Sequence, residues 1–231
     1  MLNILYRISD KGHPKEKLPN ATKDHCLQNA LDVFGMEGFY VCADNCSSET
    51  IQMVRSKGVE PILSTLGNCG SWRFCIEFAL QNLNEDSIIY ILEDDYLHLK
   101  TAKQALIEGI NIADYVSLYD HPDKYEDGVN PLVKDGSEAC RVCLSKTVHW
   151  KETNSTTMTF ATRVRIIKED KKLWWKNTEG KYPNDFKAFQ ELCKTSFFKK
   201  KQKRKLISAL PGLATHTELA WLAPLVDWQK V

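Results

Sequence analysis

The most informative part of the chain reads Ser87-Ile-Ile-Tyr-Ile-Leu-Glu-Asp-Asp95. The uninterrupted apolar run Ile88–Leu92 is typical of a strand buried on both faces, as in the parallel sheet of an α/β protein. The run ends at three successive carboxylates, Glu93, Asp94 and Asp95, which we call the acidic triplet. In open α/β sheets, ligands bind beyond the carboxyl ends of the strands. We therefore expect the acidic triplet to lie at a binding edge.

Strands and helices alternate on the amino-terminal side of this run. Strands are predicted over Leu2–Ile8, Gly38–Ala43 and Val59–Ser64. Helices are predicted over Thr22–Phe34 and Ser47–Lys57. The next helix has the cleanest apolar period of the chain, formed by Trp72, Cys75, Ile76, Ala79, Leu80 and Leu83. Repeated strand–helix units indicate a parallel sheet with right-handed crossovers.

Beyond the acidic triplet the pattern becomes mixed. Val142–Trp150 and Thr156–Ile166 are expected to form a hairpin, whose second arm turns Met158, Phe160, Val164 and Ile166 to one face. Helices are predicted over Lys100–Ile110, Lys168–Lys176 and Asn184–Lys194, and a strand over Tyr115–Tyr119. We expect one α/β domain over residues 1–231, in which helices flank a central, mostly parallel sheet. A nucleotide-binding half (1–99) would precede an acceptor half (100–231) that contains a smaller, mixed hairpin region.

Composition and charge exclude several classes of protein. The 31 Lys and Arg residues against 30 Asp and Glu leave a net charge of +1, without the basic field typical of nucleic-acid binding. No apolar run approaches the roughly 20 residues of a membrane span, and Met1–Arg7 lacks the core of a signal peptide. Of the eight cysteines, only Cys140 and Cys143 form a C-x-x-C pair, which falls short of a zinc site. We expect a cytoplasmic protein with reduced cysteines.

Three adjacent carboxylates repel one another unless a cation or several hydrogen-bond donors compensate. Carboxylate oxygens together with phosphate oxygens suit Mg²⁺ or Mn²⁺. A divalent ion that bridges the protein and a diphosphate is therefore one interpretation of the acidic triplet. The other is a solvated strand end that caps the following helix.

The acidic triplet, about ninety residues into the chain and after three strand–helix units, resembles the D-x-D motif of nucleotide-sugar glycosyltransferases with the GT-A fold. The layout is similar to that of small glycosyltransferases of bacteria and large algal viruses. The resemblance implies that Asp95 binds Mn²⁺ or Mg²⁺, that Glu93 faces the ribose or base, and that Asp94 reaches the metal shell or the donor sugar. A late histidine, His216, would complete the metal site; the alternative is an ordinary hydrogen-bonded histidine.

The same resemblance assigns nucleotide contacts to the ends of the first two strands, at Ile8, Ser9 and Asp44. Asp44 would accept a hydrogen bond from the base or ribose, or would simply cap the helix Ser47–Lys57. The segment Leu66–Arg73 opens a helix with two glycines, and such a helix start presents backbone N–H groups to an anion. Asn68 and Arg73 are therefore candidates for contacts with the sugar nucleotide, the alternative being an ordinary turn with a solvated Arg73.

In the acceptor half, an inverting transferase needs a group that takes the proton of the acceptor hydroxyl. Asp185, at the start of a predicted helix, is the first candidate for this base, and His149 is a second. The alternative role of Asp185 is a helix cap. The basic run Lys199–Lys205 is interpreted as a solvated segment, as a lid over the donor diphosphate, or as a peripheral membrane contact.

Together these features predict a metal-dependent glycosyltransferase. It would transfer a sugar from a nucleoside diphosphate sugar, with UDP as the first candidate, to a glycan, a glycoprotein or another hydroxyl acceptor. The alternatives are a sugar nucleotidyltransferase and a non-catalytic carbohydrate-binding subunit. A nucleotidyltransferase is expected to have a loop rich in glycine and arginine after the first strand, whereas Ser9–Pro19 contains one glycine and no arginine.

Overall fold

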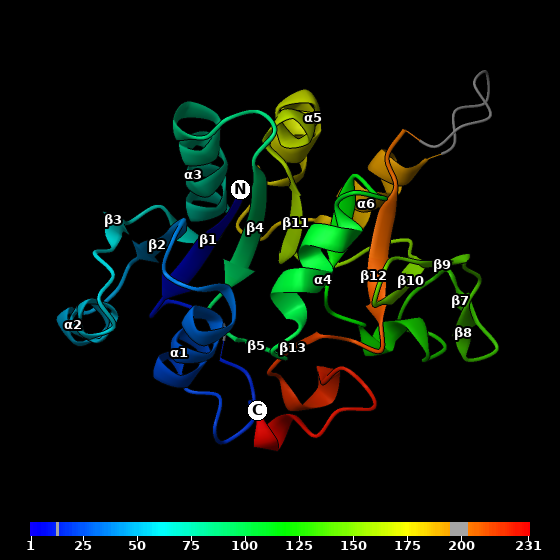
Figure 1. Cartoon of the computed structure of the whole chain (residues 1–231), viewed down its shortest axis with the longest axis horizontal. Helices are drawn as coiled ribbons and strands as arrows, with labels where there is room; N and C mark the ends of the chain where they lie inside the picture. Colours follow the sequence, from blue (N-terminus) through cyan, green and yellow to red (C-terminus); the bar gives the residue numbers. More distant parts are fainter. Residues whose placement is uncertain (13, 195–202) are drawn as a thin grey trace.

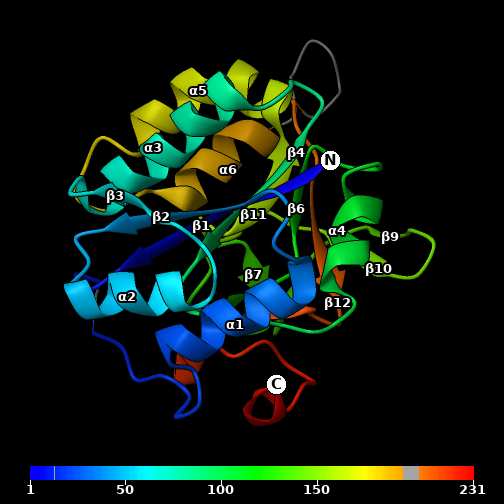
Figure 2. The same cartoon turned by 60° about the vertical axis from the view of Figure 1, so that its left-hand side comes forward.

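The computed structural model describes residues 1–12, 14–194 and 203–231. Within these residues, nine strands form one sheet in the order β3-β2-β1-β4-β11-β6-β12-β10-β9, and helices cover both faces (Figures 1 and 2). The strands are β1 (Leu2–Ser9), β2 (Phe39–Asp44), β3 (Ile62–Ser64), β4 (Ile88–Glu93), β6 (Tyr115–Ser117), β9 (Val142–Leu144), β10 (His149–Glu152), β11 (Phe160–Arg163) and β12 (Leu206–Leu210). The predicted fold class, a mostly parallel sheet flanked by helices with a smaller hairpin region, is confirmed.

The first four strands are parallel, as the alternating pattern predicts. β1 pairs with β2 on one side and with β4 on the other, and β2 pairs with β3. The chain therefore runs outward from β1 to β3 and then returns to the other side of β1 to form β4. This reversal is a topological switch point, where the carboxyl ends of β1 and β4 leave a crevice between the loops that follow them.

Six helices are present in the described chain, three on each face of the sheet (Figure 2). They are α1 (Lys23–Phe34), α2 (Ser48–Ser56), α3 (Gly67–Asn82), α4 (Ala102–Gly109), α5 (Val164–Asn177) and α6 (Asp185–Cys193). Ser47 accepts a hydrogen bond from the Thr50 amide at the start of α2, and Gly58 adopts a φ of +83° just beyond its end. One apolar core lies under α1 and α4, and a second lies under α3, α5 and α6.

The strand β11 corrects one prediction for the second half. Residues 156–166 do not pair with β10, the strand that contains Trp150; instead, β11 lies antiparallel between β4 and β6. The hairpin is formed by β9 and β10, and α5 begins at Val164. Met158 and Phe160 enter the second core as predicted, but Ala161 and Thr162 of β11 are also buried. Val164 and Ile166 reach that core from α5 and not from a strand. Periodicity determines which face of a strand is buried but not which strand becomes its neighbour.

Smaller elements complete the chain around the switch point. A two-stranded sheet joins β5 (Tyr96–His98) to β13 (Ala214–His216), so that His216 lies opposite Tyr96. The short strands β7 (Val133–Lys134) and β8 (Ser137–Glu138) form a separate pair. Three 3₁₀ turns cover Pro122–Lys124, Leu219–Trp221 and Trp228–Lys230. None of the described helices is both long and apolar enough to cross a bilayer. Most of the basic run Lys199–Lys205 lies outside the described residues.

Candidate active site

The acidic triplet lies at the switch point, between the ends of β1 and β4 and next to the loops that follow them. Register brings Arg7 of β1 beside Glu93 of β4, and it brings Ser9 beside Asp44 of β2. Ile8, between these two positions on β1, is buried in the first core. The sheet therefore gathers Ser9, Asp44 and the acidic triplet at one edge, as the sequence predicts.

Glu93 is held by a buried arginine that the sequence analysis did not single out. Arg7 Nη1 lies 3.2 Å from Glu93 Oε1, and Arg7 Nη2 donates to Asn68 Oδ1 and to the Asn68 carbonyl, both at 2.8 Å. Arg7 Nη2 also lies 3.1 Å from Ser71 Oγ. One guanidinium thus links β1, β4 and the start of α3. An arginine inside an otherwise apolar strand is the sequence signal that identifies it.

Asp94 points toward the end of β1 and the start of α1. Its Oδ2 accepts a hydrogen bond from the Ser9 amide at 3.1 Å, and Lys23 Nζ lies 4.0 Å away. Lys23 also donates to the Ser9 carbonyl at 2.6 Å and pairs with Asp10. Burial, together with the charge of Asp95, raises the pKa of Asp94 above its ordinary value. A further positive charge at the binding edge would therefore stabilise the ionised form of Asp94.

Asp95 and His216 meet, although 121 residues separate them in the chain. Asp95 Oδ2 lies 3.0 Å from His216 Nε2, because β13 pairs with the strand that follows the acidic triplet. Burial alone would raise the pKa of Asp95, but the His216 hydrogen bond and the charges of His216, Lys17 and Lys15 outweigh it and lower the pKa. The structure therefore brings the two expected metal ligands together, while their binding of a metal stays a prediction.

Two lysines from the loop after β1 reach the same two atoms. Lys17 Nζ lies 3.2 Å from Asp95 Oδ2, and Lys15 Nζ lies 3.2 Å from His216 Nε2 and 3.5 Å from Glu218 Oε2. Among the described residues, no group of three or more His, Cys, Asp and Glu side chains is arranged as a metal site. Asp95 Oδ2 already has Lys17 Nζ at 3.2 Å and His216 Nε2 at 3.0 Å, so the residues as arranged do not fit a bound divalent ion.

The carboxylate of Asp44 is already hydrogen-bonded to other groups of the protein. It is buried, and its carboxylate accepts hydrogen bonds from the amides of Leu66 (2.6 Å) and Gly67 (3.0 Å) and from Ser64 Oγ (2.8 Å). These contacts fix the turn that opens α3, whereas Ser47 caps α2. Asp44 therefore supports the site by positioning the start of α3, and a direct contact with a nucleotide stays a prediction.

Arg73, one turn into α3, points toward α5. Its Nε donates to Thr178 Oγ1 at 2.8 Å, its Nη2 donates to the Trp175 carbonyl at 2.6 Å, and the guanidinium lies 5.5 Å from the centre of the Trp175 ring. It thereby supplies donors to the carboxyl end of α5. Asn68, by contrast, lies at the edge of the acidic triplet through its bonds to Arg7.

The two candidate bases differ in burial. Asp185 is the first residue of α6, and its Oδ1 accepts a hydrogen bond from the Phe186 amide at 2.7 Å. Burial raises the pKa of Asp185 to about 6, and the charge of Glu93 acts in the same direction, while that of His121 opposes it. His149 is exposed on β10, four strands from β4, or about 19 Å at ordinary strand spacing.

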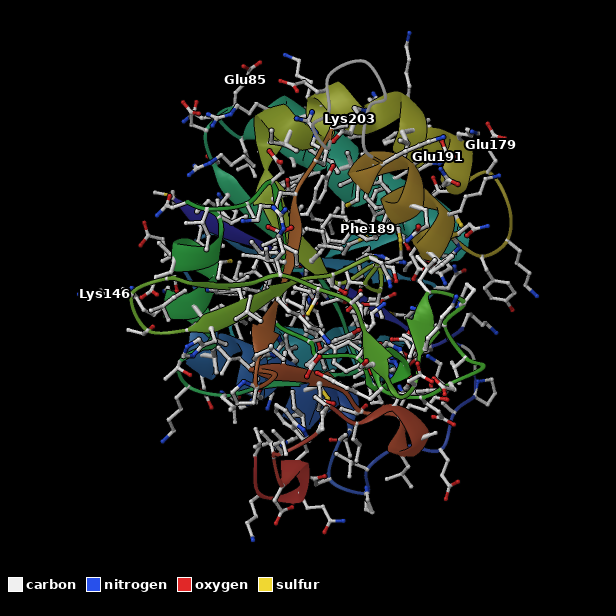
Figure 3. The ribbon with its side chains drawn as sticks, turned by 90° about the vertical axis from the view of Figure 1, so that its right-hand side faces the viewer. Glu85, Lys146, Glu179, Phe189, Glu191 and Lys203 are labelled. Carbon is white, nitrogen blue, oxygen red and sulfur yellow. The ribbon has the colours of Figure 1, made fainter. Side chains whose placement is uncertain are left out.

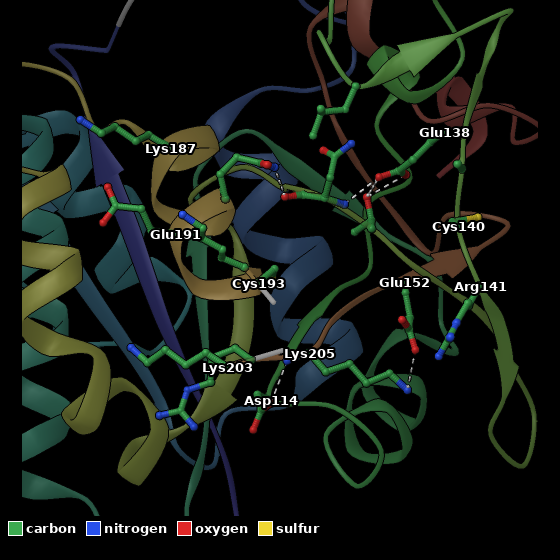
Figure 4. A pocket seen from close by; sticks show the side chains of 17 residues that line it. Asp114, Glu138, Cys140, Arg141, Glu152, Lys187, Glu191, Cys193, Lys203 and Lys205 are labelled. Carbon is green, nitrogen blue, oxygen red and sulfur yellow. Dashed lines mark hydrogen bonds and ion pairs between the residues drawn. The ribbon is translucent and has the colours of Figure 1, made fainter. Parts of the chain in front are cut away.

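A large cavity lies on the opposite edge of the sheet (Figure 4). It has a volume of about 1470 Å³ and is bordered by α6, the start of β12 and the β9–β10 hairpin. Glu191 and Lys203, two of its lining residues, lie above the buried Phe189 in Figure 3. Asp114 and Lys205, which precede β6 and β12, place the cavity at the amino ends of these strands, away from the acidic triplet.

Comparisons with known proteins give weak similarities only. No protein-family model and no curated protein matches the chain. Among solved structures, the bifunctional IspDF of Campylobacter jejuni has a TM-score of 0.41 at 12% identity. The match covers 81% of this chain and 46% of the IspDF chain. S. aureus TarS, residues 1–349, has a TM-score of 0.47 at 14% identity, and the match covers 90% of this chain and 57% of the TarS chain.

A third structure, CMP:2-keto-3-deoxy-manno-octonic acid synthetase complexed with CTP, has a TM-score of 0.45 at 14% identity, with coverages of 74% and 78%. The chain therefore spans about half the length of the first two structures. Similarity at this level identifies no function.

Proposed function

We propose that the protein is a glycosyltransferase of the GT-A type. It would transfer a sugar from a nucleoside diphosphate sugar, with UDP as the first candidate, to a hydroxyl group of a glycan or glycoprotein. The observation that carries the proposal is the convergence of the acidic triplet, its basic partners and the start of α3 at the switch point between β1 and β4. Asp185, the first residue of α6, adds a carboxyl group whose pKa is raised to about 6.

Each kind of group matches one need of glycosyl transfer. The departing nucleoside diphosphate requires positive charge, which Arg7, Lys15, Lys17 and Lys23 supply at this edge. The sugar hydroxyls require acceptors, which the acidic triplet offers. The acceptor hydroxyl must lose a proton, and a carboxylate with a pKa of about 6 takes a proton more readily than an ordinary one. Asp185 is therefore the proposed base.

The resemblance also implies Mn²⁺ or Mg²⁺ at Asp95 and His216. Such an ion would neutralise the diphosphate. Because Lys17 and Lys15 contact the two ligand atoms, an ion would bind there only after both lysines had moved away.

A sugar nucleotidyltransferase remains a second candidate because of the loop after β1. This enzyme class is expected to have a loop rich in glycine and arginine at that position. The loop here lacks arginine, but Lys15 and Lys17 bring two ammonium groups to the binding edge. The same groups would suit the triphosphate of a nucleotide substrate.

Product analysis separates the two reactions. The protein would be incubated with a panel of UDP- and GDP-sugars and glycan acceptors, and in parallel with nucleoside triphosphates and sugar 1-phosphates. The proposal expects release of nucleoside diphosphate in the first set, with Asp185→Asn lowering the rate by about 100-fold or more. The exposed Asp227→Asn serves as a control that should leave the rate unchanged. Release of pyrophosphate in the second set alone would refute glycosyl transfer.

A further inference from the structure

We propose that Lys15 and Lys17 provide the positive charge that binds the donor diphosphate, in place of a divalent cation. This inference rests on the proposed function, since it assigns the charge that a nucleoside diphosphate would meet. It departs from the metal-binding role that the resemblance to GT-A enzymes implies for Asp95 and His216.

The first argument is the position of the two ammonium groups. Lys17 Nζ and Asp95 Oδ2 are 3.2 Å apart, and Lys15 Nζ and His216 Nε2 are also 3.2 Å apart. The lysine side chains are 30% and 33% exposed, whereas those of Asp95 and His216 are 13% and 10% exposed. The lysines are therefore the more exposed members of the two contacts, so an arriving anion meets them before it meets Asp95 and His216.

The second argument is that backbone hydrogen bonds hold the segment of these two lysines against the segment that follows His216. Lys17 forms an antiparallel bridge with Glu218, the Leu18 amide donates to the Thr217 carbonyl at 2.9 Å, and the Leu219 amide donates to the Glu16 carbonyl at 2.9 Å. In an extended segment, residues two apart point to the same side. Lys15 and Lys17 are therefore held on one side of a loop that is tied to the segment after His216, so their convergence follows from the fold.

The third argument is a buried donor without a partner. Tyr6 is 1% exposed, and its hydroxyl has no hydrogen-bond partner among the described residues. Burial is the main cause that raises the pKa of Tyr6, and the charge of Asp94 adds to it. Tyr6 lies on β1, the strand that leads into the binding edge, so this hydroxyl is a free donor on the strand next to the acidic triplet.

In the reaction, the acceptor oxygen forms a bond to the anomeric carbon of the donor sugar. The bond from that carbon to the β-phosphate oxygen breaks, and its electron pair stays on the phosphate oxygen. The acceptor proton passes to the carboxylate of Asp185. Lys15 and Lys17 donate hydrogen bonds to the oxygens on which the negative charge grows, and no metal ion takes part.

Binding of inorganic pyrophosphate and UDP tests this role directly. Isothermal titration calorimetry would compare the wild-type protein in EDTA with the protein in MnCl₂. We expect both ligands to bind in EDTA without a gain from Mn²⁺. Lys17→Met should weaken binding by about 10- to 100-fold, the range for loss of one charged hydrogen bond. Lys17→Arg should retain most of the affinity. Lys11→Met, an exposed lysine of the same loop, is the matched control and should bind like the wild type.

Thermal unfolding of each variant establishes that it is folded before its affinity is compared. The inference is overturned if pyrophosphate and UDP bind only with Mn²⁺, if they bind under neither condition, or if folded Lys17→Met binds them as tightly as the wild type. Sugar transfer that needs Mn²⁺ and tolerates Lys17→Met would refute the inference but preserve the proposed function. Lysine-dependent binding in EDTA without transfer from any donor would refute the function and preserve the charge assignment.

Discussion

Replacing Asp185 by Asn should stabilise the protein at neutral pH. The environment at the start of α6 raises the pKa of this carboxyl from 3.8 to about 6, mainly by burial. At 1.36 kcal/mol per pKa unit, keeping the group charged at pH 7 costs the folded state about 3 kcal/mol at most. Since the side chain is partly exposed, solvent screening reduces the expected gain from Asp185→Asn to about 1–2 kcal/mol.

The stability difference between Asp185→Asn and the wild type should depend on pH. In the unfolded chain the carboxyl loses its proton near pH 4, whereas in the folded protein it keeps the proton until about pH 6. The wild type therefore loses stability as pH rises from 4 to 6, and it regains nothing above that range. Asn does not ionise, so the advantage of Asp185→Asn should be close to zero at pH 4 and reach its full value by pH 7.

Urea unfolding at a series of pH values between 4 and 8 measures this difference. Asp24→Asn is the control, because Asp24 also lies in the first turn of a helix but is exposed and pairs with Lys57 at 2.8 Å. Loss of that pair should lower stability slightly. A stability difference for Asp185→Asn that stays flat from pH 4 to pH 7, or that favours the wild type at pH 7, would show that the Asp185 carboxylate is not destabilised by partial burial. The same pKa predicts that kcat/KM rises with pH up to about 6.

Two further substitutions separate structural roles from binding roles. Asp44→Ala leaves the Leu66 and Gly67 amides and the Ser64 hydroxyl without their acceptor. We therefore expect the free energy of unfolding, measured in urea, to fall by about 2–4 kcal/mol. The affinity for UDP should also fall, because the first turn of α3 is no longer held in place. A variant of normal stability that has lost only nucleotide affinity would instead favour direct recognition by Asp44. Arg73→Met removes two hydrogen bonds at the end of α5 and should lower stability by about 1–2 kcal/mol, while calorimetry should find its affinity for UDP unchanged. Weaker binding by a variant of unaltered stability would show that Arg73 contacts the ligand.

The parallel half of the fold was predictable from sequence because its signals are local. The apolar run Ile88–Leu92 became β4, and the helix with the cleanest period became α3. Ser47 and Gly58 mark the ends of α2 through side-chain capping and a positive φ, both of which act within a few residues. Each of these features depends on a short segment, so each could be inferred without knowing what packs against it.

The partners of β11 and of the loop lysines were not predictable in this way. β11 chooses β4 and β6 as neighbours through packing across the whole sheet, although its own periodicity specifies only its buried face. Lys15 is 201 residues from His216 in the chain, and its position depends on the bridge between Lys17 and Glu218. Charged residues in a loop have no period that points to such a contact, so the sequence predicts neither lysine at the site.

The acidic triplet illustrates why the spacing of charged residues alone does not identify a metal site. Three adjacent carboxylates require compensation, and a cation is the simplest source of it. In the fold, however, the three side chains turn to different elements. Glu93 pairs with Arg7 of β1, Asp94 accepts from the Ser9 amide, and Asp95 contacts His216 and Lys17. Protein donors therefore offset the repulsion that the sequence predicts. Lys23 and Lys17 are more exposed than Asp94 and Asp95, the carboxylates they contact, whereas Arg7 is more buried than Glu93. Of the two exposed lysines, Lys17 makes the closer contact, so its ammonium group is the first candidate for neutralising a diphosphate at this edge.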